Sequence, residues 1–166
     1  PYLSLKYNLA KFYLSNRMKR FAIKEFEEIL EIDVQDHMGV RYELMATYCN
    51  LEDYDKAKNF FECEQMEYHE EDLMIVPMMT VSLMTGHIED ADFYFDFLYA
   101  KNPEFENYLK MIEQGDDERL VAETLKVNPI LFEANSMKSL LMVFNQVVDL
   151  SQSEYYFTWL IEKYCA

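Results

Sequence analysis

The chain has 166 residues, enough for one domain with a sizeable core. Only three residues are glycine and four are proline, whereas 51% are hydrophobic, including 12 Phe, 13 Tyr and 11 Met. Sheet proteins need frequent turn residues, and phosphate-binding enzymes need flexible glycine loops. The composition therefore disfavours both classes and favours long helices joined by short turns.

The net charge of −16 is unevenly distributed along the chain. Residues 51–100 hold two basic and thirteen acidic side chains, whereas residues 1–50 hold seven of each. Nucleic-acid binding requires a basic footprint, and the small cluster of Arg17, Lys19 and Arg20 does not supply one, so we expect no nucleic-acid partner. The acidic middle either attracts a basic protein partner or only keeps a solvated face soluble.

The sequence shows no sign of export or of membrane insertion. No basic leader followed by an apolar run opens it, and polar residues interrupt every apolar stretch before it reaches the length of a membrane span. Cys49, Cys63 and Cys165 form an odd set without a pattern, as expected for free, core or semi-buried thiols in a reducing compartment. We therefore expect a cytoplasmic protein that does not bind membranes.

A short repeat organises the first two thirds of the chain. Ala22, Ala57 and Ala91 recur at a nearly constant spacing, and each is followed one helical turn later by Phe. The spacing matches the period of the tetratricopeptide helix–turn–helix unit, in which a small residue lets two helices approach closely and the next aromatic fills the groove between hairpins. It predicts one all-α domain over residues 1–166, a right-handed superhelix of hairpins with repeats at about 3–36, 38–71 and 72–105.

Local signals mark the helices of these hairpins in chain order. Residues 21–30 place Phe21, Ile23, Phe26, Ile29 and Leu30 broadly on one helical stripe. Asp53 is a candidate N-cap between the helices of the second unit, and Gly86 a candidate terminator in the third. Asn102-Pro103 closes the third unit.

Beyond the third unit the repeat signal weakens, and residues 106–166 are predicted to add further helices and a C-terminal capping pair. The predicted helices are 104–114, stopped by Gly115; a helix from Asp116–Asp117 to about Lys126; and helices at roughly 130–148 and 152–164, the last opening with a Ser151-x-x-Glu154 capping box. Repeat arrays need a cap because their last hairpin would otherwise expose its apolar face.

One phrase between units one and two extends the repeat into a narrower resemblance. Asp36-His37-Met38-Gly39-Val40-Arg41-Tyr42 resembles the D-N-x-G-x-R-Y phrase of tetratricopeptide-like proteins of the suppressor-of-tumorigenicity family. The phrase also occurs in bacterial proteins that join this fold to a small zinc-binding module of the secretion ATPase. The resemblance continues through Asp53-Tyr54-x-Lys56-Ala57, Asn102-Pro103 and Tyr108-Leu109, and covers about residues 1–112. It implies a helical-repeat interaction domain, although His37 and Met38 depart from the pattern and the zinc-module cysteines are absent.

We find no catalytic, metal or cofactor site in the sequence. The densest group of potential ligands, His69 to Asp72, is contiguous, and adjacent positions on a helix diverge, so a solvated helix end is favoured. No zinc-protease, serine-hydrolase or phosphate-loop motif is present. Cys49 has no basic neighbour in sequence that marks it as a nucleophile. We therefore expect a chain that is not an enzyme and holds no cofactor.

The predicted function is binding of a protein or peptide, as an extended segment or a helix, on the concave face formed by the first helix of each hairpin. Tyr7, Lys11, Arg41, Tyr42 and Asn50 are the candidate contact residues. Tyrosines offer stacking area at low entropic cost, and the two basic side chains suit a carboxylate. Alternatively, Arg41 and Tyr42 only knit adjacent hairpins together.

The rival prediction is self-association. The last predicted helix is rich in aromatic residues, and Tyr155, Tyr156 and Trp159 would then form a homodimer surface and not a cap.

Overall fold

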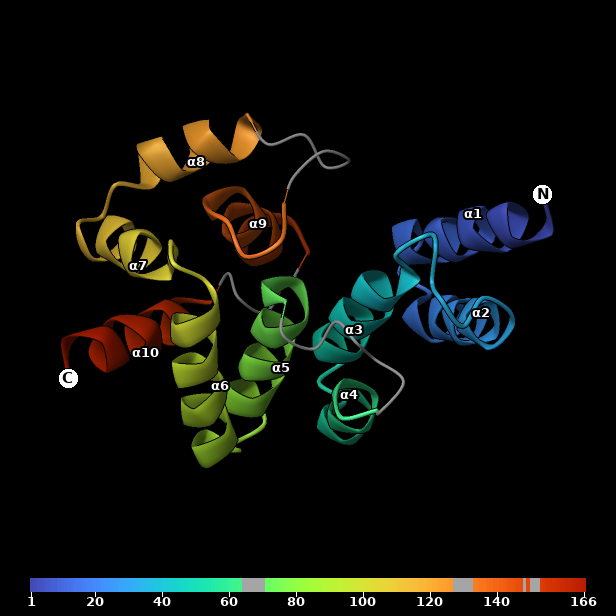
Figure 1. Cartoon of the computed structure of the whole chain (residues 1–166), viewed down its shortest axis with the longest axis horizontal. Helices are drawn as coiled ribbons and strands as arrows, with labels where there is room; N and C mark the ends of the chain where they lie inside the picture. The colour runs from blue at the N-terminus through green and yellow to red at the C-terminus, as the bar shows by residue number, and fades with distance from the viewer. Residues whose placement is uncertain (64–70, 127–132, 148, 150–152) are drawn as a thin grey trace.

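The computed structural model describes residues 1–63, 71–126, 133–147, 149 and 153–166, and every regular element in that part of the chain is a helix (Figure 1). The elements are α1 (Tyr2–Ser15), α2 (Lys19–Ile32), α3 (Val40–Asn50), α4 (Tyr54–Phe61), α5 (Asp72–Met84), α6 (Ile88–Lys101), α7 (Phe105–Glu113), α8 (Asp117–Leu125), α9 (Met137–Met142), the π-helical turn η1 (Val143–Val147) and α10 (Glu154–Cys165). The prediction of an all-α chain is confirmed for these residues.

The first six helices form three consecutive pairs, α1 with α2, α3 with α4 and α5 with α6. Figure 1 shows the pairs following one another in a row, from α1 and α2 at one end toward α7 and α10 at the other. The loops inside the pairs are the short segments 16–18, 51–53 and 85–87. The helices thus fall inside the predicted repeat units, although residues 64–70, which end the second unit, lie outside the described part.

Several helix ends use the capping chemistry that the sequence suggests. The Asp53 carboxylate accepts a hydrogen bond from the Lys56 N–H at 3.2 Å, which confirms it as the N-cap of α4. Gly86 follows α5 at φ +84° and Gly115 follows α7 at φ +64°, both in the left-handed region that favours glycine. These residues stop the helices near the predicted positions.

The repeated small residues lie where two helices meet. Ala22, Ala57 and Ala91 are fully buried on the second helix of each pair. The Phe one turn later is buried in each unit as well: Phe26, Phe61 and Phe95. Phe21 differs from the predicted stripe because it is 55% exposed, lying on the flank of α2 with its ring 5.4 Å from that of Tyr13.

The predicted helix at 130–148 is wrong in its extent. Residues 133–136 are not helical, α9 covers only Met137–Met142, and the chain then widens into η1, while 130–132 and 148 lie outside the described residues. The Ser136 hydroxyl explains the late start, because it accepts from the Ser139 N–H at 3.2 Å and caps α9 there.

The last helix, α10, lies beside α7 at the end of the row opposite α1 (Figure 1). It packs against α7 and α5. The Tyr156 hydroxyl is hydrogen-bonded to the Thr80 hydroxyl of α5 at 2.8 Å. Its N-cap is Ser153, whose hydroxyl accepts from the Tyr156 N–H at 3.2 Å, whereas Ser151 of the predicted capping box lies outside the described residues. The C-terminal helices therefore extend the core of the hairpins.

Candidate binding groove

A groove of about 920 Å³ runs along the first helices of the hairpins. Residues of α1 and α3 line it, together with the residues that begin α5. Its other wall comes from later in the chain, where Ala134 and Met142 of the α9 region and Asp149 beyond η1 line it. The volume lies in the range of ligand sites, and the groove is the candidate functional site of the protein.

Four of the five predicted contact residues line this groove. Tyr7 and Lys11 are one turn apart on α1, and Tyr42 and Asn50 are two turns apart on α3. Residues spaced by four or eight positions share a face of a helix, so each pair turns toward the same side. The structure thus brings these four side chains together on one surface.

The α1 side of the groove meets α3 through one carboxylate. The Glu43 carboxylate lies 2.7 Å from the Lys11 ammonium and accepts a hydrogen bond from the Tyr7 hydroxyl at 3.3 Å. Burial, together with the Glu43 charge, raises the pKa of Tyr7 to about 12, so the phenol stays neutral and able to donate at physiological pH. A ligand carboxylate at Lys11 would have to compete with Glu43.

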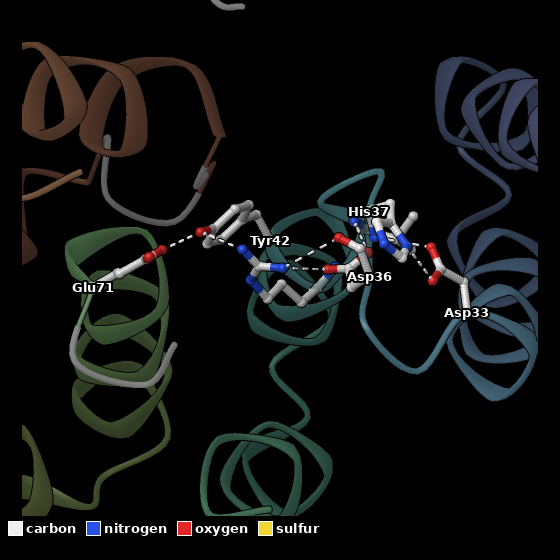
Figure 2. Close-up of polar contacts among 7 residues, drawn as sticks. Asp33, Asp36, His37, Tyr42 and Glu71 are labelled. Carbon is white, nitrogen blue, oxygen red and sulfur yellow. Dashed lines mark hydrogen bonds and ion pairs between the residues drawn. The ribbon is translucent and has the colours of Figure 1, made fainter. Parts of the chain in front are cut away.

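Arg41, the fifth predicted residue, does not line the groove. It is only 8% exposed, and its guanidinium donates to the Asp36 carboxylate at 2.8 Å and to the Tyr42 hydroxyl at 2.8 Å (Figure 2). The guanidinium also lies over the Tyr42 ring, 4.4 Å from its centroid. Arg41 therefore positions Tyr42 and is not available to a ligand.

The segment that carries the family resemblance, residues 36–42, begins α3 and connects it to the start of α5. The Asp36 carboxylate accepts from the N–H groups of Val40 and Arg41 at 2.7 and 3.0 Å, capping the first turn of α3. The Tyr42 hydroxyl donates to Glu71, the residue before α5, so α3 is tied to the third hairpin (Figure 2). Burial and the Glu71 carboxylate raise the pKa of Tyr42. This geometry gives Tyr42 a bridging role between hairpins as well as a place in the groove.

The departure at His37 also has a local explanation. Its ring Nδ1 and its backbone N–H each lie 2.8 Å from an oxygen of the Asp33 carboxylate (Figure 2). The hydrogen bond from the His37 side chain lowers the pKa of Asp33. The contact fixes the turn between α2 and α3.

Sequence reasoning missed the residues that close the groove from the far end of the chain. The Asn50 side-chain oxygen accepts from the Asp149 N–H at 2.9 Å, and the Asp149 carboxylate lies 3.8 Å from the Lys19 ammonium. These contacts join positions in the first third of the chain to one near its end, and no local pattern marks such pairs. Only Glu71 could have been suspected, because it immediately precedes a helix.

Neither the cysteines nor the acidic and histidine side chains of the described residues form a reactive or metal-binding site. All three cysteines are free; Cys49 is buried, as expected, but Cys63 and Cys165 are exposed, which corrects the prediction that they are core or semi-buried. Burial raises the pKa of Cys49 and keeps it a thiol. Over the described ranges, no three His, Cys, Asp or Glu side chains gather as a metal site would require. His69 and Glu70 lie outside those ranges.

The aromatic residues of the last helix divide between core and surface. Tyr156 is fully buried, so it is not available for the dimer contact that was predicted for it. Trp159 is partly buried, with its ring 5.9 Å from that of Phe95 in an edge-on contact. Tyr155, in contrast, is 57% exposed. Most of this aromatic surface thus holds α10 against the rest of the molecule.

Comparisons with protein-family models, with curated proteins and with solved structures find no match for this chain. None of the helices that the structure describes has the length and apolar character needed to cross a bilayer.

Proposed function

We propose that the chain is a tetratricopeptide-like array whose concave groove binds a peptide or a helix of a partner protein. Three consecutive helix pairs support the array, because the same small and aromatic positions are buried in each of them. The groove along α1 and α3 supports the binding role, and the clustering of Tyr7, Lys11, Tyr42 and Asn50 on it is the observation that carries the proposal.

The charges of the groove suggest how a ligand would lie in it. Its lysines, Lys11 and Lys19, come from α1 and α2. Its carboxylates come from α3 and from segments beyond it: Glu43, Glu71 and Asp149. A bound segment with its acidic residues toward α1 and its basic residues toward α5 would complement both ends.

Lys11 is the best residue with which to test the groove. It is exposed, whereas Tyr42 also bridges two hairpins, so loss of binding in a Tyr42 variant would not separate the two roles. Lys110 provides a matched control. Both side chains are 46% exposed and both pair with a glutamate, at 2.7 Å for Lys11 and 2.8 Å for Lys110.

The experiment selects peptides from a random display library on the whole protein and measures their affinity by fluorescence anisotropy. We expect Lys11→Ala to weaken the selected peptides by about fivefold or more, because it removes a charged contact, and Lys110→Ala to leave them unchanged. Met38→Glu, which adds a carboxylate at the 37%-exposed Met38 on the groove, should weaken them too. Selected peptides that bind both groove variants as tightly as the wild type would contradict the proposal.

Self-association through α10 is the alternative function. With Tyr156 in the core, this alternative would depend mainly on Tyr155 and on the partly buried Trp159. Sedimentation equilibrium at high micromolar concentration tests it, since a monomer there excludes a functional dimer through this helix.

A further inference from the structure

The outer face of α1 carries a row of exposed apolar side chains. Leu5 is 68% exposed, Leu9 40% and Phe12 58%, and Tyr2 at 61% continues the row toward the N-terminus. The spacing of three and four residues places them on one face of the helix. We call Leu5, Leu9 and Phe12 the α1 stripe. In Figure 1, α1 lies at one end of the row of hairpins.

The repeat shows what such a stripe meets elsewhere in the same molecule. The equivalent positions in the next two repeat units are Val40, Leu44 and Thr47 in α3 and Met74, Met78 and Val81 in α5. All six are at most 3% exposed. Helix α3 packs against α2, and α5 packs against α4, the second helix of the hairpin before it in each case. The positions equivalent to the stripe are thus buried in the later units, where α3 and α5 also pack against the second helix of the preceding hairpin.

The covering helix α2 also shows which polar group belongs beside the stripe. Its Glu27 accepts a hydrogen bond from the Tyr48 hydroxyl at 2.5 Å and lies 3.8 Å from the Lys56 ammonium. The equivalent of Tyr48 on α1 is Tyr13, which is partly buried at the edge of the stripe. A helix covering α1 would therefore need a carboxylate at the position that Glu27 holds on α2.

The charge of α1 and of the start of α2 also favours a covering helix that carries carboxylates. Residues 1–24 contain six basic and no acidic side chains, whereas the rest of the chain contains nine basic and thirty-one acidic ones. Lys6 is already paired with Glu25 and Glu28 of α2. The turn that follows the stripe carries the exposed Arg17, and Arg20 is exposed in the first turn of α2. Two copies of this face would bring like charges together, which disfavours a symmetric dimer through α1.

We propose that the α1 stripe is a second docking site, which binds an amphipathic helix of a partner protein as α2 binds α3. The helix lays an apolar face on Leu5, Leu9 and Phe12. A carboxylate at the edge of that face meets Tyr13 and the basic turn at Arg17. This site is separate from the concave groove, so either can be present without the other.

The test uses the molecule's own covering helix as the probe. A fluorescein-labelled peptide with the sequence of residues 18–33 carries the α2 face and Glu27, and anisotropy measures its binding to the whole protein. We expect saturable binding that weakens about tenfold or more in Leu5→Ser/Phe12→Ser, because two apolar side chains no longer become buried. Phe93→Ser is the matched control, since Phe93 on α6 is 61% exposed, and it should leave the affinity unchanged. A peptide with Glu27→Gln should bind about threefold to tenfold more weakly than the original.

Several results would overturn this proposal. The stripe is not a helix site if the peptide fails to bind at millimolar concentration, or binds the double variant as tightly as the wild type. Binding of anionic phosphatidylserine vesicles that depends on Leu5 and Phe12, without binding of the peptide, would assign the stripe to a membrane surface. A dimer in sedimentation that Leu5→Ser/Phe12→Ser dissociates would assign it to a second copy. Both variants should remain folded, because the substituted side chains are exposed, and thermal melts check this.

Discussion

Asp36 and Asp72 are both buried carboxylates at the start of a helix, yet different groups stabilise them. Asp36 meets a cation, since its carboxylate accepts from the Arg41 guanidinium as well as from two N–H groups of α3. The hydrogen-bond donors that meet Asp72 in the described structure are neutral: the N–H groups of Leu73 and Asn135 at 3.0 Å, the Asn102 amide at 3.0 Å and the Ser139 hydroxyl.

The two carboxylates also differ in what they join. The donors to Asp36 come from residues four and five positions away, so this contact organises one helix start. Asp72 joins the start of α5 to Asn102 at the end of α6 and to Ser139 in α9, across 30 and 67 residues. The difference teaches that a local ion pair sets a turn, whereas a neutral network holds distant parts of the chain together.

Removing Asp72 should have the largest effect on stability. Asp72→Ala leaves buried N–H and amide groups without their acceptor at three separate elements, and we expect the free energy of unfolding to fall by about 3 kcal/mol. Asp72→Asn keeps one acceptor oxygen and should cost less. Urea unfolding followed by circular dichroism measures both. Asp96→Ala, an exposed carboxylate on α6, is the control and should change stability by less than about 0.5 kcal/mol.

Breaking the Asp36 pair should cost less than removing Asp72. In Arg41→Met the methionine side chain fills the space of the arginine methylenes. Asp36 keeps both N–H donors of α3, at the positive end of that helix. We expect a loss of about 1.5 kcal/mol in the same urea experiment. A loss as large as that of Asp72→Ala would show that the ion pair, and not the cap, is what holds this junction.

The same contrast explains how much of the structure the sequence could predict. The hairpins could be predicted because their signals are local: Ala22 and Phe26 recur at a fixed period, and Asp53 and Gly86 end or begin helices through their own backbone chemistry. The four groove residues followed from this register, since helical spacing fixes which side chains share a face. Arg41 does not line the groove with them, because it is buried against Asp36, a partner that a helical wheel does not include.

The far wall of the groove could not be predicted, because it depends on contacts without local signals. Asn50 meets Asp149 across 99 residues, and Asn135 meets Asp72 across 63. The extent of α9 was also missed, although Asn135-Ser136 carried a usable signal. Asn135 adopts φ +55° and Ser136 caps the helix, both of which are common for these residue types just before a helix.

The smallest expected effect is on the pH dependence of stability, in which Asp72 at the start of α5 and Asp33 at the end of α2 should respond to acid in opposite ways. Burial raises the pKa of Asp72 above its ordinary 3.8, so the extra stability that comes from its protonated form is complete below pH 3.8 and is lost as the pH rises through the raised value. The hydrogen bond from His37 lowers the pKa of Asp33 from 3.8. Its contribution is present above pH 3.8 and is lost as the pH falls through the lowered value.

Carboxyl-carbon NMR titration checks this opposition directly, with Asp72→Asn and Asp33→Asn used to assign the two signals. We expect the Asp72 midpoint above 3.8 and the Asp33 midpoint below it. The stability difference between wild type and Asp72→Asn should shrink as the pH rises from 3 to 7, because only the wild type comes to carry a buried charge. An Asp72 midpoint below 3.8 would contradict this expectation, because the neutral donors would then outweigh burial.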